Sequence, residues 1–168
     1  MLEIGGGLGA YTHAFLGFRK GTRVIYVDTP PVLYVATQYL KAVCPEQVVD
    51  YLIIREMNAN EVRNEFNAQK DKGMIWCIPP WELEKFQGIS VNHAFNSSSF
   101  QEMTPDQRTY YYRFIKENRS DRAIHTFFVY DTPDSDALES HMESFFSFDK
   151  LRDPRLDLAG TTYLCWSS

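Results

Sequence analysis

Cysteine is scarce in this sequence, and its positions follow no spacing that is typical of a metal site or a disulfide framework. The 168 residues contain only Cys44, Cys77 and Cys165. Zinc sites repeat cysteine or histidine at short intervals, and disulfide frameworks use an even and denser set of cysteines. We therefore expect buried free thiols, no bound metal and a reducing compartment, which favours a cytoplasmic protein.

An excess of positive charge and long apolar runs are also missing. The formal net charge is −5 at pH 7, whereas a nucleic-acid-binding domain usually presents a basic face. No apolar stretch approaches the roughly 20 residues that a membrane-spanning helix needs, and no signal peptide is visible. We therefore expect neither nucleic acid nor a membrane among the partners.

The composition that is present predicts a well-packed α/β domain. Hydrophobic residues make up 44% of the chain and aromatic residues 15%, which suffices for a core at this length. Short apolar segments, the candidate strands, alternate with segments of helical periodicity. The expected strands are 2–4, 24–27, 74–78, 91–95, 124–130 and 161–166. This alternation predicts one domain over residues 1–168, a Rossmann-like three-layer sandwich with a mostly parallel sheet and helices on both faces.

Two regions leave the secondary structure open. The letters VVDYLII in the region 46–72 fit either a strand or the buried side of a helix. Residues 131–160 are mixed and show few clear periods. Elsewhere local signals are stronger, because Pro30 and Pro31 suit the first turn of a helix, and Thr104 before Pro105 is typical of a helix start.

The segment 2–15, LEIGGGLGAYTHAF, predicts a strand, a glycine turn and a helix. Glycine lets the backbone approach a ligand, and a helix N-terminus offers unpaired N–H groups. Two fingerprints fit, that of dinucleotides in Gly5-x-Gly7-x-x-Ala10 and that of S-adenosylmethionine in Glu3-x-Gly5-x-Gly7-x-Gly9. Glu3 favours S-adenosylmethionine, because a carboxylate attracts the ammonium of its methionine tail. Asp28, at the end of the second strand, can accept hydrogen bonds from the ribose hydroxyls of either ligand.

Four segments together resemble a known family. LEIGGGLGAYTHAF, YVDTPPVLYVATQYL, IPPWELEKF and FNSSSFQEM are similar to segments of the sugar O-methyltransferase group of class I S-adenosylmethionine-dependent methyltransferases. The resemblance covers most of residues 2–115 and implies O-methylation of a hydroxyl on a sugar or a glycan precursor. Two features depart from the family: Asn92 stands where the fourth strand usually begins with Asp, and residues 50–72 form a longer region than expected.

The resemblance also implies which residues hold the cofactor. Glu3 and the glycines Gly5, Gly7 and Gly9 would hold the methionine moiety, and Asp28 would bind the ribose. Beyond the ribose, the adenine ring would lie between residues that follow the next strand, namely Pro79, Pro80 and Trp81. Three further residues would lie at the carboxyl end of the fourth strand, where ligands of open α/β sheets bind: Asn96, Ser97 and Ser98.

No side chain is singled out as the catalytic base. Methyl transfer mainly needs alignment of acceptor and donor, although a general base helps a sugar hydroxyl to react. The candidates are His93, Glu102 and His141, and for each of them a packing or capping role is at least as well supported. We expect packing or surface roles for His13 and His125, and a solvated turn for the acidic stretch that begins at Asp131.

Two other functions stay open. An NAD(P)-dependent oxidoreductase would use the same glycine turn, although Glu3 argues against it. A truncated, non-catalytic Rossmann-like binding module is the other alternative, because the first strand begins at Leu2 and the usual N-terminal cover is missing. We therefore expect either a fragment, or a chain whose acceptor side is open or is completed by another subunit of a homo-oligomer.

Overall fold

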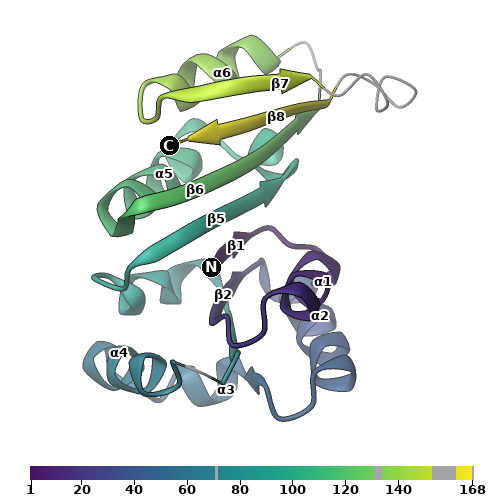
Figure 1. Ribbon diagram of the computed structural model, residues 1–168, viewed down its shortest axis with the longest axis vertical. Coiled ribbons are helices and arrows are strands. Elements are labelled where there is room, and N and C mark those ends of the chain that lie inside the picture. The colour runs from purple at the N-terminus through teal and green to yellow at the C-terminus, as the bar shows by residue number, and fades with distance from the viewer. Residues whose placement is uncertain (71, 131–133, 153–161, 168) are drawn as a thin grey trace. The chain divides into compact units, whose positions relative to one another are not determined.

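The computed structural model describes residues 1–70, 72–130, 134–152 and 162–167 (Figure 1). The chain divides into two compact units, Met1–Ile89 and Ser90–Ser168. The expectation of a single domain over residues 1–168 stays a prediction. In the described part of the chain, no helix combines the length and the apolar character that a membrane span requires.

Parallel strands form the sheet of the first unit. β1 (Leu2–Ile4), β2 (Val24–Val27), β3 (Val48–Val49) and β4 (Ile75–Ile78) lie in the order β3-β4-β2-β1. Every residue of β1, β2 and β4 is buried, as expected for a parallel sheet that is covered on both faces. Because the strands are parallel, their carboxyl ends meet at one edge.

Helices cover both faces of this sheet. α1 (Ala10–Phe18) and α2 (Pro30–Val43) pack on one face, where Leu16 and Leu40 join a buried cluster with Tyr26 and Cys77. On the opposite face lie α3 (Tyr51–Ile54), α4 (Ala59–Ala68) and the 3-10 helix η1 (Pro80–Phe86). The rings of Phe66 and Phe86 lie 5.8 and 5.7 Å from that of Trp76. The predicted α/β class, with helices on both faces of a parallel sheet, is confirmed.

Asp50 resolves the ambiguous letters VVDYLII into a strand followed by a helix. β3 ends at Val49, and the Asp50 carboxylate accepts a hydrogen bond from the Leu52 amide at 2.9 Å, which caps α3. The long region after α2 is thus an edge strand followed by two helices. Farther along, η1 contains the letters PWELEKF that carry part of the family resemblance.

The second unit combines a parallel and an antiparallel part. Its elements are β5 (Val91–Ser97), the 3-10 helix η2 (Ser99–Glu102), α5 (Pro105–Asn118), β6 (Arg119–Tyr130), α6 (Ser135–Glu143), β7 (Phe148–Arg152) and β8 (Thr162–Ser167). The strand order is β5-β6-β8-β7, with β5 and β6 parallel and the other neighbours antiparallel (Figure 1). Phe100, Tyr112, Phe127 and Phe146 form its buried aromatic centre.

One expectation about this unit was wrong. β6 begins at Arg119 and not at Ile124, so His125 lies within the strand and not at its amino end. The mixed region after the strand contains α6 and β7, which had no assignment from the sequence. The predicted turn at Asp131 lies outside the described residues. Farther along, Asp134 stands at the N-cap position of α6 without a side-chain capping hydrogen bond, and Asp136 lies in the first turn of that helix.

Candidate functional site

The candidate site lies at the edge of the first unit where its parallel strands end. The glycine loop 5–9 follows β1, Asp28 follows β2, Asp50 follows β3, and residues 79–81 follow β4. Ligands of open α/β sheets bind at this edge. The structure thus brings the predicted residues of the first unit to one place.

The glycine loop has a backbone that other residues rarely adopt. Gly5, Gly7 and Gly9 have φ angles of 64°, 61° and 80°, in the left-handed region where a Cβ atom is strained. Gly5 donates a hydrogen bond to the Val27 carbonyl at 2.8 Å, and Gly9 is the N-cap of α1. The predicted strand–turn–helix cradle is present, and the loop leads directly into the N-terminus of α1.

Gly6 is a constrained position that the fingerprint does not reveal. A Cβ atom there would lie 2.4 Å from Cε2 of Tyr26 and 2.6 Å from Oε1 of Glu3. The loop backbone therefore lies directly against the Glu3 carboxyl group. The run of consecutive glycines was the only signal in the sequence that could have pointed to Gly6.

Glu3 is a buried carboxyl group beneath this loop. Its side chain is 1% exposed, and Oε2 accepts a hydrogen bond from the hydroxyl of Thr12 on α1. Burial raises the pKa of Glu3 to about 7; the negative charge of Asp28 also raises it, while the Thr12 hydrogen bonds lower it. Glu3 is therefore close to half-ionised at neutral pH.

Asp28 fastens the glycine loop to the end of β2. One carboxylate oxygen accepts from the Gly7 amide at 3.0 Å, and the other accepts from the Thr29 amide at 2.7 Å. The Tyr26 hydroxyl donates to the Gly7 carbonyl at 2.7 Å. Burial raises the pKa of Asp28 above its usual value, although these amide hydrogen bonds oppose the shift. Asp28 thus shapes the loop in addition to its predicted role towards the ribose.

Two aromatic rings lie after β3 and β4 at the same edge. Trp81 is 59% exposed, and its ring centroid lies 6.5 Å from that of Tyr51 in an edge-to-face arrangement. Pro80 precedes Trp81 at the start of η1 and is half-buried. No pattern in the sequence indicated Tyr51, because α3 could not be distinguished from a strand.

The predicted cofactor residues of the second unit lie at the carboxyl end of β5, as expected. Asn96 is fully buried, and its side-chain oxygen accepts from the Phe100 amide at 3.3 Å while its amide donates to the Ser99 hydroxyl. Ser97 is exposed, and Ser98 has a φ angle of 68°. Asn96 therefore holds the turn that leads into η2.

The structure does not single out a base among the candidates. His93 is half-buried in β5, and burial lowers its pKa to about 4. Glu102 is exposed at the end of η2, and Nε2 of His141 lies 3.0 Å from the Thr109 hydroxyl. In the first unit, His13 contacts the hydroxyl of Tyr39 on α2 at 2.8 Å, which agrees with the expected packing role.

Metal binding and the chemistry of an oxidoreductase can both be compared with the described residues. No group of three or more histidine, cysteine, aspartate or glutamate side chains gathers within that part of the chain in a way that could hold a metal ion. A Tyr-x-x-x-Lys spacing, which one class of oxidoreductases uses, occurs in α5 at Tyr112 and Lys116. Tyr112 is fully buried and Lys116 is exposed, so the two side chains do not share an open surface.

Comparison with solved structures identifies the fold. No family model and no curated protein matches the sequence. The structure is similar to a TehB-like S-adenosylmethionine-dependent methyltransferase from Corynebacterium glutamicum (TM-score 0.61, 11% identity, 99% of this chain and 78% of that chain). It is also similar to an rRNA methylase from Streptococcus thermophilus (TM-score 0.60, 11% identity, 99% and 85%). The mitomycin 7-O-methyltransferase MmcR matches with a TM-score of 0.57 and 14% identity over 98% of this chain, which spans only 47% of that enzyme.

These neighbours share a fold and differ in the acceptors that their names give. The chain therefore has the Rossmann-like fold of class I S-adenosylmethionine-dependent methyltransferases. A likeness at such low identity shows the fold alone, because one fold carries many functions and the site decides among them.

Proposed function

We propose that the chain binds S-adenosylmethionine and is a methyltransferase that acts on a hydroxyl group. The observation that carries the proposal is the buried Glu3 carboxyl group directly beneath a glycine loop that Asp28 fastens in place. A negative charge at this point attracts the ammonium group of the methionine moiety and opposes the pyrophosphate of a dinucleotide. The methyltransferase fold supports the same conclusion.

Each part of the cofactor has a proposed place in the first unit. The methionine moiety lies along the loop of Gly5, Gly7 and Gly9, and the ribose hydroxyls donate to lone pairs of Asp28 that the Gly7 and Thr29 amides leave open. The adenine ring lies against Pro80 and Trp81, with Tyr51 as a second aromatic neighbour. Asn96 and Ser97 stay predicted contacts from the second unit.

The cofactor itself would supply a methyl group that is activated on a sulfonium centre. The residues of the chain would bind and orient it, since alignment of the acceptor is the main requirement of an in-line displacement. For the acceptor we propose a hydroxyl of a sugar or a glycan precursor. This finer proposal is based on the resemblance of IPPWELEKF and FNSSSFQEM to the sugar O-methyltransferase group.

Calorimetric titration with S-adenosylhomocysteine and with NADH tests the cofactor. We expect binding of S-adenosylhomocysteine and no binding of NADH. Asp28→Asn, which keeps the size of the side chain but removes its charge, should weaken binding by about 1.5–3 kcal/mol, the range for hydrogen bonds to charged groups. Tight binding of NADH without a response to S-adenosylhomocysteine would contradict the proposal.

The acceptor requires a separate assay. Transfer of a labelled methyl group from S-adenosylmethionine to a panel of free and nucleotide-linked sugars should give a product with at least one of them. If the chain binds S-adenosylhomocysteine but methylates no sugar, the sugar acceptor is wrong while the cofactor assignment stands.

A further inference from the structure

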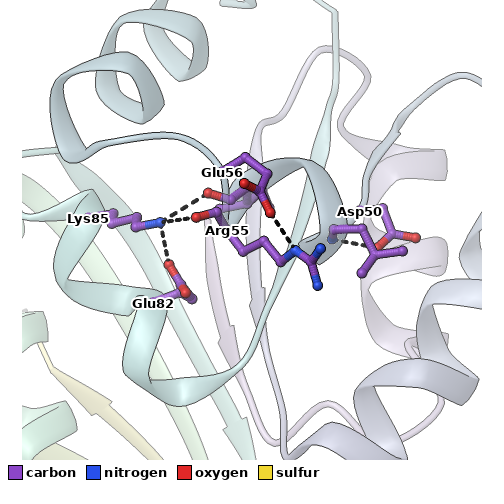
Figure 2. A network of polar contacts seen from close by, with 7 residues as sticks. Asp50, Arg55, Glu56, Glu82 and Lys85 are labelled. Atoms are coloured by element: carbon purple, nitrogen blue, oxygen red, sulfur yellow. Dashed lines mark hydrogen bonds and ion pairs between the residues drawn. The ribbon is translucent and has the colours of Figure 1, made fainter.

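Lys85 is a partly buried cation that joins two short segments of the first unit. Its ammonium group lies 2.7 Å from Oε2 of Glu82 and donates to the carbonyl oxygens of Ile54 and Arg55 at 3.0 and 3.3 Å (Figure 2). The side chains of Lys85 and Glu82 are only 23% and 11% exposed. Two donors of the ammonium group go to these carbonyl oxygens, and the Glu82 carboxylate lies close enough for an ion pair.

The two joined segments carry the aromatic rings of the candidate site, the exposed Trp81 and the half-buried Tyr51. Ile54 is the last residue of α3, whose first residue is Tyr51, and Lys85 lies in η1, whose second residue is Trp81. α3 has four residues, too few to be stable alone. Its last carbonyl group, that of Ile54, accepts from the Met57 amide at 3.1 Å just beyond the helix, and Lys85 adds a second donor to it from η1.

A second polar anchor of α3, at its N-terminus, is weaker. Asp50, the N-cap of α3, forms an ion pair with Lys41 at 2.5 Å, but the Lys41 side chain is 44% exposed. Exposed ion pairs contribute little because water and salt screen them. The contacts of Lys85 are more shielded, so they set the position of α3 relative to η1 more firmly.

We infer that Lys85 is a positioning residue that fixes the separation of the Tyr51 and Trp81 rings for the adenine base of the cofactor. This inference rests on the proposed function. Base stacking depends on the distance and tilt of the aromatic faces, so a shift of α3 against η1 weakens it. Neither the fingerprint nor the family resemblance assigns a role to Lys85.

A double-mutant cycle on S-adenosylhomocysteine binding tests this role. Lys85→Met should weaken binding about tenfold, or about 1.4 kcal/mol, which lies within the range known for base–aromatic stacking. In a Trp81→Leu background the same substitution should change the affinity by less than about twofold, because Lys85 acts through the Trp81 ring. Lys85→Arg should restore most of the affinity, since a guanidinium group can also bridge carboxylate and carbonyl oxygens.

Two controls complete the experiment. Lys70→Met removes an exposed lysine of the same unit and should leave the affinity unchanged. If Lys85→Met does not fold, Lys85→Gln takes its place, because its amide is one bond shorter and leaves a polar partner for Glu82. Circular dichroism and the thermal midpoint show which variant is folded.

The outcomes separate this inference from the proposed function. Equal affinity of wild type and Lys85→Met overturns the role of Lys85 while the cofactor assignment stands. If Lys85→Met weakens binding equally in the wild-type protein and in Trp81→Leu, the substitution loosens the whole unit, which also overturns the role of Lys85. Absence of S-adenosylhomocysteine binding by the wild type overturns the proposed function and, with it, the role of Lys85.

Discussion

Gly6 and Glu3 show how closely single atoms constrain this loop. The Gly6 backbone lies against the Glu3 carboxyl group and the Tyr26 ring, both of which are nearly or fully buried. Neither neighbour can move freely, because Glu3 accepts a hydrogen bond from Thr12 and the Tyr26 hydroxyl donates one to the Gly7 carbonyl. The glycine loop is therefore tightly packed against its neighbours, although its composition alone would indicate a flexible backbone.

Gly6→Ala should disrupt this arrangement. The new methyl group would lie 2.4 Å from the Tyr26 ring, so we expect the free energy of unfolding to fall by about 1–3 kcal/mol, as in other overpacked sites. Gly17→Ala is the matched control, because that position in α1 has open space around it and alanine favours a helix by about 0.5–1 kcal/mol. Urea unfolding of both variants measures the difference, and equal stability of the two would refute the packing argument.

Glu3 should make cofactor binding depend on pH. With a pKa of about 7, Glu3 is mostly neutral at pH 6 and mostly ionised at pH 8. A ligand ammonium group favours the ionised form, so the affinity for S-adenosylhomocysteine should rise with pH, by at most about tenfold per unit below pH 7. Calorimetry at pH 6, 7 and 8 measures this rise.

Glu3→Gln provides the comparison for this titration. Glutamine has a similar size and does not ionise, so its affinity should be nearly constant over the same pH range. A wild-type affinity that is as flat as that of Glu3→Gln would show that Glu3 does not sense the ligand charge.

At the scale of elements, a histidine side chain completes the pairing of β5 with β6. The register of these parallel strands shifts between Val91 and His93, and just beyond this irregularity the Ala94 amide donates to Nδ1 of His125 at 3.1 Å. Burial, together with smaller contributions from His93 and Arg119, lowers the pKa of His125 to about 4. Only the neutral ring can accept this hydrogen bond.

Acid should therefore weaken the second unit through His125. Between pH 6.5 and about 4 the folded chain binds fewer protons at this site than the unfolded chain, so the free energy of unfolding falls as the pH falls. The contribution is complete above pH 6.5. His125→Asn keeps an acceptor near the position of Nδ1 without titrating, so its thermal midpoint should fall less than that of the wild type between pH 7 and 4.5. Parallel midpoint curves for the two proteins would exclude this contribution.

At the scale of the whole molecule, the two units differ in what they offer a ligand. The first unit has the glycine loop, Asp28 and the exposed Trp81 at the ends of parallel strands. The second unit ends in an antiparallel pair, and the contacts of Asn96 hold its own turn. We therefore expect the cofactor to be held mainly by the first unit.

Hydrogen exchange with and without S-adenosylhomocysteine tests this expectation. Peptides that cover residues 2–12, 26–33 and 76–86 should become protected, because the ligand orders the amides of the glycine loop and the segment around Trp81. Protection of residues 91–100 would support the predicted contacts of Asn96 and Ser97. Protection confined to the second unit would contradict the location of the site.

The sequence by itself determined the features that depend on near neighbours in the chain. The positive φ angles of Gly5, Gly7 and Gly9 favour glycine over other residues, so the glycine pattern in the sequence sufficed to predict the loop. Thr104 and Pro105 begin α5 through a local cap, which Gln107 completes. The apolar strands and periodic helices gave the α/β class for the same reason.

The tertiary structure alone decided the features that depend on residues distant in the chain. The lack of space for a side chain at Gly6 is due to the Tyr26 ring. The burial and the raised pKa of Glu3 are due to the elements packed around it. Tyr51 and Trp81 lie 30 positions apart and meet only because β3 and β4 are parallel neighbours. Packing, desolvation and strand order are properties of the assembled chain, so no local pattern encodes them.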